Sequence, residues 1–172
     1  MGRGGLTGSL RSPVAARVQL VAVALRVALA LLFLTTWGSN LHKGLYSATG
    51  YRGLIDYYAR TGDAPTPWKA VMRSVARAAT FTSKAQLVAE LVFGVLLLAG
   101  IATRPVAFVA ALFLSALWLS EIGVPHEWIW SLVFPTLASL AVSVLSGGRT
   151  LGLDGWLLDR RPLEHQPAWV RG

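Results

Sequence analysis

The 172-residue sequence contains no cysteine, only eight acidic residues and only three histidines. The lack of cysteine excludes disulfides, thiolate catalysis, iron–sulfur ligation and cysteine-based zinc sites from this chain. Charged residues of both signs make up 14% of the sequence, which is too few for an ordinary soluble domain of this size. The scarcity of charge indicates a membrane protein.

Apolar residues are abundant instead: they make up 54% of the chain, and the mean hydropathy is +0.54. A helix of roughly 20 residues crosses a hydrocarbon core of about 30 Å. Four continuous runs approach or reach that length, and they cover residues 18–37, 86–102, 105–122 and 128–145. The runs do not alternate apolar with polar residues, which favours helices over a barrel. We therefore predict an all-α fold, a polytopic membrane four-helix bundle.

The spans divide the chain into a basic N-terminal tail at residues 1–17, a membrane domain at 18–158 and a C-terminal tail at 159–172. The first run is too long for the core of a signal peptide and contains Arg26, so we expect an uncleaved span. Thr103 suits a helix cap and Pro105 an early helical position. The second and third spans should therefore form an antiparallel hairpin with a tight turn at residues 103–105.

The first loop, residues 38–84, is long and carries two amphipathic patterns. Apolar side chains recur at helical spacing and predict helices within residues 50–60 and 67–79. A basic stripe of Lys69, Arg73 and Arg77 accompanies the second pattern. These helices either lie in the membrane interface or pack over the mouth of the bundle. In both arrangements the loop forms an amphipathic helical lid.

Basic residues give the chain a formal net charge of +8, and they flank the apolar runs. No RNA- or DNA-binding motif accompanies them, so we expect anionic lipid headgroups of the bilayer rather than nucleic acid as the partner. The loop between the third and fourth spans contains two glutamates and no lysine or arginine. This asymmetry favours a topology with both termini in the cytoplasm.

Three blocks of the sequence resemble the DoxX/DoxD family of small four-helix membrane proteins. Residues 26–45 resemble the first helix of the family, with Arg26 near its middle and Lys43 just past its end. Residues 90–104 resemble a block in which a glutamate, here Glu90, precedes a glycine and a Thr-Arg hairpin. Residues 147–154 resemble the Gly-Arg exit that ends on an aspartate, here Asp154. The likeness covers about residues 18–158 and implies a four-helix membrane fold.

The DoxD branch of this family includes the membrane subunit of thiosulfate:quinone oxidoreductase. The resemblance implies a subunit of a quinone-linked oxidoreductase that acts on thiosulfate or another sulfur compound in a bacterial or archaeal plasma membrane. Quinone would be the cofactor, and an extracytoplasmic or membrane redox subunit would supply the electrons. Because one fold hosts different activities, a non-enzymatic membrane scaffold or assembly factor is the alternative. A small-solute transporter is less favoured, because no internal repeat is visible, and a homo-oligomer is left open.

Arg26 and Glu90 are the ionisable residues most clearly inside the predicted spans. An unpaired charge in hydrocarbon is costly, so each needs a partner or a wet cavity. If the first two spans are antiparallel neighbours, the heights of these residues differ by about one helical turn. We therefore predict an ion pair between Arg26 and Glu90. Such a pair either fixes the helix register or holds Glu90 ionised for proton transfer.

Aromatic and basic side chains gather where the spans end. His42 and Lys43 follow the first span and would donate hydrogen bonds to a quinone carbonyl, although for Lys43 alone simple snorkelling is the favoured interpretation. The indole rings of Trp37 and Trp118 would stack on a quinone ring, whereas the tryptophans at residues 128 and 130 fit interfacial anchors. We predict a quinone pocket beneath the loop, lined by Trp37, His42, Glu90 and Trp118, with Glu90 and His42 handling protons. The histidines lack the spacing of a metal or haem site, so neither is expected.

Overall fold

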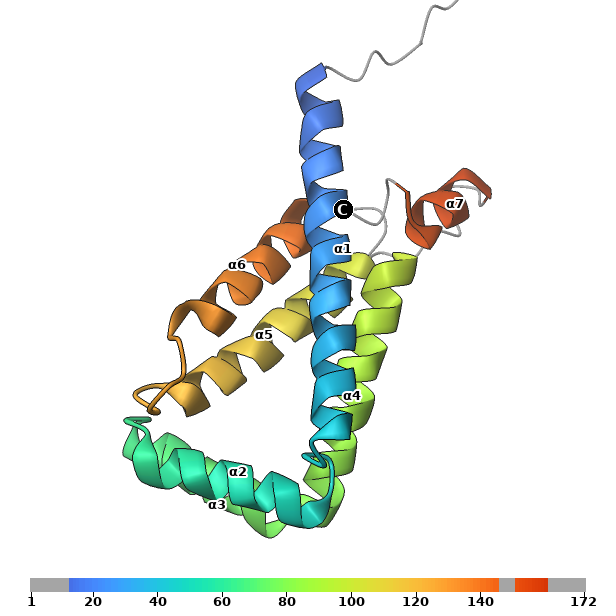
Figure 1. Ribbon diagram of the computed structural model, residues 1–172. Helices are drawn as coiled ribbons and strands as arrows, with labels where there is room; N and C mark the ends of the chain where they lie inside the picture. The colour runs from blue at the N-terminus through green and yellow to red at the C-terminus, as the bar shows by residue number, and fades with distance from the viewer. Residues whose placement is uncertain (1–12, 146–150, 161–172) are drawn as a thin grey trace, which may run out of the picture.

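A computed structural model describes residues 13–145 and 151–160 of the chain, and all seven regular elements in these ranges are helices. Their bounds are α1 Pro13–His42, α2 Ala48–Thr61, α3 Thr66–Arg77, α4 Ala79–Ala99, α5 Thr103–Glu121, α6 Trp130–Leu145 and α7 Leu153–Arg160 (Figure 1). The described ranges contain no strand, which confirms the all-α class. Predictions for residues 1–12, 146–150 and 161–172 lie outside the described residues.

Three of these helices, α1, α4 and α5, are long and apolar enough to cross a membrane. Helix α6 is also apolar but has 16 residues and contains Pro135. It is therefore shorter than the roughly 20 residues that a perpendicular span requires. Large apolar side chains lie exposed on the outer sides of the long helices, for example Val88, Val92 and Val95 on α4. These features are compatible with an integral membrane protein.

The long helices pack as two pairs, α1 with α4 and α5 with α6, and α1 also contacts α6 (Figure 1). The buried core lies where the pairs meet and is built from Leu29, Ala30, Phe33, Leu97, Ala107, Ala110, Leu114 and Val142. Gly94 permits the close approach of α4 to α1, because a Cβ there would overlap the side chain of Leu34. Small residues at such contacts let two membrane helices pack backbone to backbone.

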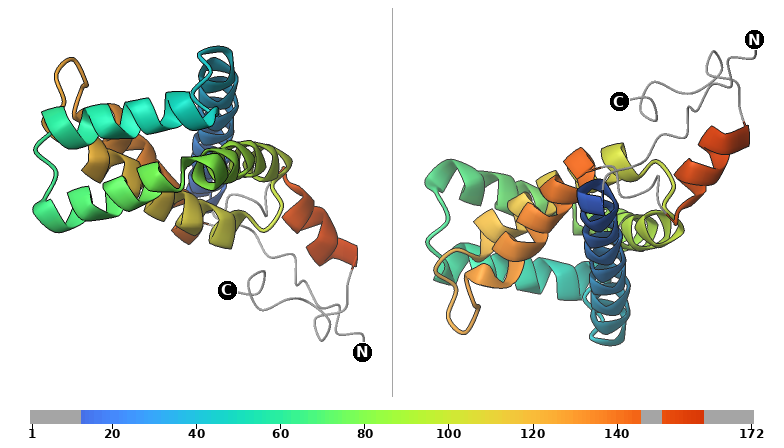
Figure 2. Two further views of the ribbon diagram at one scale, coloured as in Figure 1. Left: turned by 90° about the horizontal axis from the view of Figure 1, so that it is seen from below. Right: turned by 90° about the horizontal axis from the view of Figure 1, so that it is seen from above.

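Helices α2 and α3 lie side by side across one end of the long helices (Figures 1 and 2). Ser47 caps α2 by accepting a hydrogen bond at its Oγ from the backbone N–H of Gly50, 3.1 Å away. Helix α3 begins with a proline in its first turn, where the missing N–H has no intrahelical partner to lose. The two amphipathic helices predicted in the first loop are therefore present, each within a few residues of the expected bounds.

The turn between α4 and α5 lies at residues 100–102, not at 103–105. Gly100 and Ala102 both adopt positive φ angles, 67° and 47°. The prediction that Thr103 caps α5 is wrong, because no side chain of that hairpin serves as the cap. The Asp154 carboxylate supplies it from α7, accepting hydrogen bonds of 2.8 Å from the backbone N–H groups of Ala102 and Thr103. A carboxylate suits this position because a helix N-terminus carries partial positive charge.

Candidate functional site

Glu90 is buried in the middle of α4 with 1% of its surface exposed. Tyr46 Oη donates a hydrogen bond of 2.5 Å to its Oε2 atom, and Gln86 Nε2 donates one of 2.7 Å to its Oε1 atom. Asn40 Nδ2 lies 3.4 Å from Oε2 as a third, longer donor. Three uncharged donors from α1, α4 and the segment before α2 therefore satisfy the buried carboxyl group.

The local structure explains why these donors converge. Gln86 precedes Glu90 by four residues and lies on the same face of α4. Asn40 lies in the last turn of α1, which packs against α4. After α1 the chain turns at Gly44, where φ is +70°, and the next residues place Tyr46 in the interior with 3% exposure. Burial raises the pKa of Tyr46, and its hydrogen bond to Glu90 raises it further. Tyr46 therefore stays a neutral donor.

A second tyrosine extends the network toward α2. Tyr51 Oη donates a hydrogen bond of 2.8 Å to Gln86 Oε1. Burial raises the pKa of Tyr51, and the nearby Glu90 carboxyl raises it further, so this hydroxyl also stays protonated at neutral pH. The four side chains Tyr51, Gln86, Glu90 and Tyr46 thus form one continuous hydrogen-bonded chain. We call them the Glu90 network.

A cavity of about 190 Å³ lies between the α2–α3 pair and helices α4 and α5. Tyr51 and Gln86 of the Glu90 network reach its wall. Trp68 and Ser120 also line it and are joined by a 2.9 Å hydrogen bond from the indole Nε1 to the serine Oγ. The remaining wall is apolar and consists of Ile55, Val71, Met72, Val75, Phe113, Ala116 and Leu117. This α2–α3 cavity is smaller than the ~300 Å³ typical of drug-sized pockets, so it suits a single ring.

The predicted ion pair between Arg26 and Glu90 is not formed. Arg26 is 2% exposed, and its Nη2 atom donates a hydrogen bond of 2.8 Å to the carbonyl of Leu151. Its guanidinium lies against Gly100, at the end of α4 that is remote from the α2–α3 pair. In the antiparallel pair Asn40, not Arg26, meets Glu90, and these two α1 residues are separated by about 21 Å at 1.5 Å per residue.

The other predicted site residues do not gather around Glu90. His42 and Lys43 are exposed at the end of α1, and neither contributes to the hydrogen bonds of the Glu90 carboxyl. Trp118 lines a separate apolar groove of about 420 Å³ between α5 and α6. The indole N–H groups of Trp37 and Trp118 are buried and have no hydrogen-bond partner among the described residues. A pocket therefore exists beneath α2 and α3, but its wall does not include Trp37, His42, Lys43 or Trp118.

Sequence reasoning missed Tyr46, Gln86 and Asn40, which hold Glu90. Gln86 had a detectable signal, because a glutamine four residues before a buried glutamate shares its helix face. Tyr51 lies within the amphipathic pattern of residues 50–60, but that pattern gives it no chemical role. Tyr46 lies in an irregular segment after α1, where no periodicity shows which way a side chain points.

Within residues 13–145 and 151–160, no three histidine or acidic side chains are grouped to hold a metal ion. No family model, no curated protein and no solved structure matches this chain. The Glu90 network and the α2–α3 cavity beside it are therefore the features of this chain that indicate a function.

Proposed function

We propose that this protein is the membrane subunit of a quinone-linked oxidoreductase, and that the α2–α3 cavity receives the ring of the quinone. The observation that carries the proposal is an apolar cavity of one-ring size whose polar end, Tyr51 and Gln86, is hydrogen-bonded to a buried carboxyl group. A quinone ring is planar and apolar along its faces, and its carbonyl oxygens accept hydrogen bonds. A mostly apolar pocket with a few convergent polar groups matches that chemistry.

In this proposal α6 crosses the membrane as a fourth span, and the α2–α3 pair lies at the interface as a lid over the cavity. The length and apolarity of α1, α4 and α5 support a membrane setting. The exposed side chain of Phe81, 75% accessible at the start of α4, suits an interfacial anchor beside the lid. The quinone would enter laterally from the hydrocarbon, because its isoprenoid tail is lipid-soluble.

Reduction of a quinone to a quinol takes two electrons and two protons and converts both carbonyl groups to hydroxyl groups. A reduced partner subunit would supply the two electrons, and water at the lid would supply the two protons. The second Nε2–H of Gln86 would donate a hydrogen bond to one carbonyl oxygen, which becomes more basic as electrons arrive. Tyr51, whose single hydroxyl proton is donated to Gln86, would hold that amide in place. Glu90 acts one hydrogen bond further away: it is a positioning residue that orients the Gln86 amide. Tyr46 in turn fixes the Glu90 carboxyl.

The test is a quinone titration of the protein in lipid nanodiscs, in which binding is measured by the quenching of tryptophan fluorescence. Tyr51→Phe and Gln86→Leu each remove one donor beside the cavity, which costs about 0.5–1.5 kcal/mol. We expect quinone affinity to fall about two- to tenfold in each variant. Tyr57→Phe, which removes the hydroxyl of a residue outside the cavity wall, is the matched control and should bind like the wild type. Equal affinity in all four proteins, with the fold intact, would contradict the proposal and favour a membrane scaffold.

A further inference from the structure

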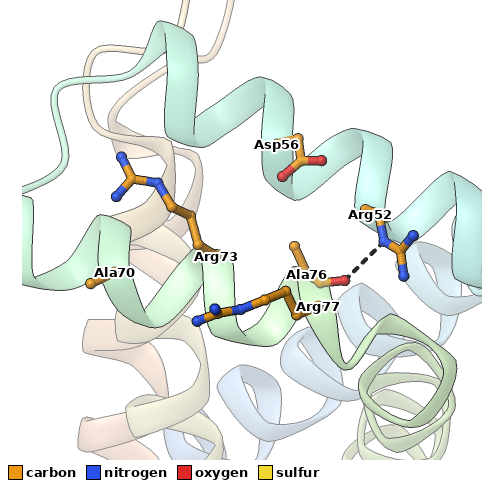
Figure 3. A pocket seen from close by; sticks show the side chains of 6 residues that line it. All are labelled: Arg52, Asp56, Ala70, Arg73, Ala76 and Arg77. Atoms are coloured by element: carbon orange, nitrogen blue, oxygen red, sulfur yellow. Dashed lines mark hydrogen bonds between the residues drawn. The ribbon is translucent and has the colours of Figure 1, made fainter.

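A second, larger hollow of about 580 Å³ lies between α2 and α3 (Figure 3). Helix α2 contributes Arg52 and Asp56 to it, and helix α3 contributes Arg73 and Arg77. Each pair is spaced by four residues, so each helix turns two charged side chains toward the same groove. Ala70 and Ala76 complete the wall, and their small side chains leave the space between the charges open. We call this hollow, lined by these six residues, the arginine groove.

The positive charges of the three arginines in the groove are not paired with acidic side chains. Arg52 Nε donates a hydrogen bond of 3.1 Å to the carbonyl of Ala76, which fixes its guanidinium across the groove (Figure 3). Arg77 Nη2 donates one of 3.0 Å to Ser74 Oγ. The side chains of Arg73 and Asp56 make no hydrogen bond or ion pair with any described residue. Three cations thus face one carboxylate that pairs with none of them.

We infer that the arginine groove binds a phosphate group. Guanidinium groups present planar donor pairs that match the oxygen atoms of a phosphate. Three arginines and one aspartate leave two unbalanced positive charges, which a phosphate monoester dianion neutralises. Arg52 is held in place before binding, so less side-chain freedom is lost when a ligand arrives. The volume of the groove also leaves room for the group to which the phosphate is attached.

The phosphate group belongs either to an anionic lipid or to a soluble phosphorylated compound, and the shared chemistry is the monoester. Two arms of one experiment distinguish these sources. In the first, glycerol 3-phosphate is titrated by calorimetry into the protein in phosphatidylcholine nanodiscs. In the second, native mass spectrometry counts the phosphatidic acid retained by protein purified from micelles that contain equal amounts of phosphatidic acid and phosphatidylcholine. Binding in the first arm identifies a soluble ligand, and retention in the second arm alone identifies a lipid headgroup.

Three variants test the groove itself. Arg73→Gln removes one unpartnered cation, and we expect affinity or lipid retention to fall about tenfold, because a charge-assisted hydrogen bond is lost. Asp56→Asn removes the carboxylate that repels the ligand and should raise affinity severalfold. Arg60→Gln is the matched control: it removes the same charge from the exposed last turn of α2, outside the groove, and should change binding by less than about twofold.

The opposite responses of Arg73→Gln and Asp56→Asn, with Arg60→Gln near wild type, support the site in either arm. The inference is overturned if the wild type binds in neither arm, or if Arg60→Gln weakens binding as much as Arg73→Gln. The second result would mean that only the overall basic charge attracts the phosphate. Because the Arg73 and Asp56 side chains hold no hydrogen bonds to described residues, we expect all three variants to keep the wild-type fold.

Discussion

Replacing Tyr46 by phenylalanine removes one hydroxyl group from the Glu90 network and leaves the buried ring in place. The distance from Tyr46 Oη to Glu90 Oε2 is 2.5 Å, at the short end of the range for hydroxyl hydrogen bonds. Leaving a buried hydrogen-bonding group without its partner costs about 1–3 kcal/mol. Asn40, 3.4 Å from the same oxygen, is too distant to replace the lost donor without movement. We therefore expect Tyr46→Phe to lower the free energy of unfolding by about 1–3 kcal/mol.

The assay is unfolding in mixed micelles, in which the fraction of SDS is raised and helix content is followed by circular dichroism. Tyr57→Phe is the matched control, because Tyr57 is 39% exposed and its hydroxyl has no hydrogen bond to a described residue. The two substitutions remove the same atom from environments that differ in burial and bonding. A loss for Tyr46→Phe within about 0.5 kcal/mol of that for Tyr57→Phe would refute the argument that the network holds Glu90.

Two further outcomes follow from the structure. Gly100→Ala should lower the free energy of unfolding by about 2 kcal/mol or more, because φ is +67° and a Cβ would overlap a buried guanidinium. Gly38→Ala is the control: Gly38 has open space around it, so this variant should be neutral or stabilising in the same SDS titration. The second concerns pH: burial raises the pKa of Tyr58, as do the nearby Glu121 and Glu127 carboxylates, and burial also raises that of Tyr51. The stabilisation from these neutral hydroxyl groups is complete below the unfolded pKa of about 10 and is lost as pH rises through the higher folded values. Tyrosinate absorbance should therefore appear at higher pH in the native protein than in the denatured one, and coincident curves would contradict the assignment.

Much of the helical framework could be predicted from the sequence, because length and periodicity are local properties. The apolar runs predicted α1, α4, α5 and α6, and the helical spacing of apolar side chains within residues 50–60 and 67–79 predicted α2 and α3. Helix bounds shifted where a cap comes from a distant residue. The start of α5 depends on the Asp154 carboxylate, which lies some fifty residues further along the chain.

The environment of Glu90 could be predicted only in part, because it depends on the register between helices. The burial of Glu90 followed from one carboxylate in an apolar run, and the structure confirms it. The partner of Glu90 could not be predicted from the sequence. The prediction of Arg26 assumed that the middles of the two apolar runs lie at the same depth in the membrane. Helix α1 continues to His42 and brings Asn40 to that depth instead. Tyr46 enters from an irregular segment whose direction is set by the turn at Gly44.

A quinone ring should bind in the α2–α3 cavity and not on another apolar surface. Photolabelling with an azidoquinone in nanodiscs, followed by peptide mapping, distinguishes the two, because the α5–α6 groove around Trp118 offers a competing apolar site. We predict labels on the wall of the α2–α3 cavity, at Trp68 or Met72, and their loss when Ala116→Phe fills that space. Labelling confined to Trp118 and Ile129, unaffected by Ala116→Phe, would contradict the account.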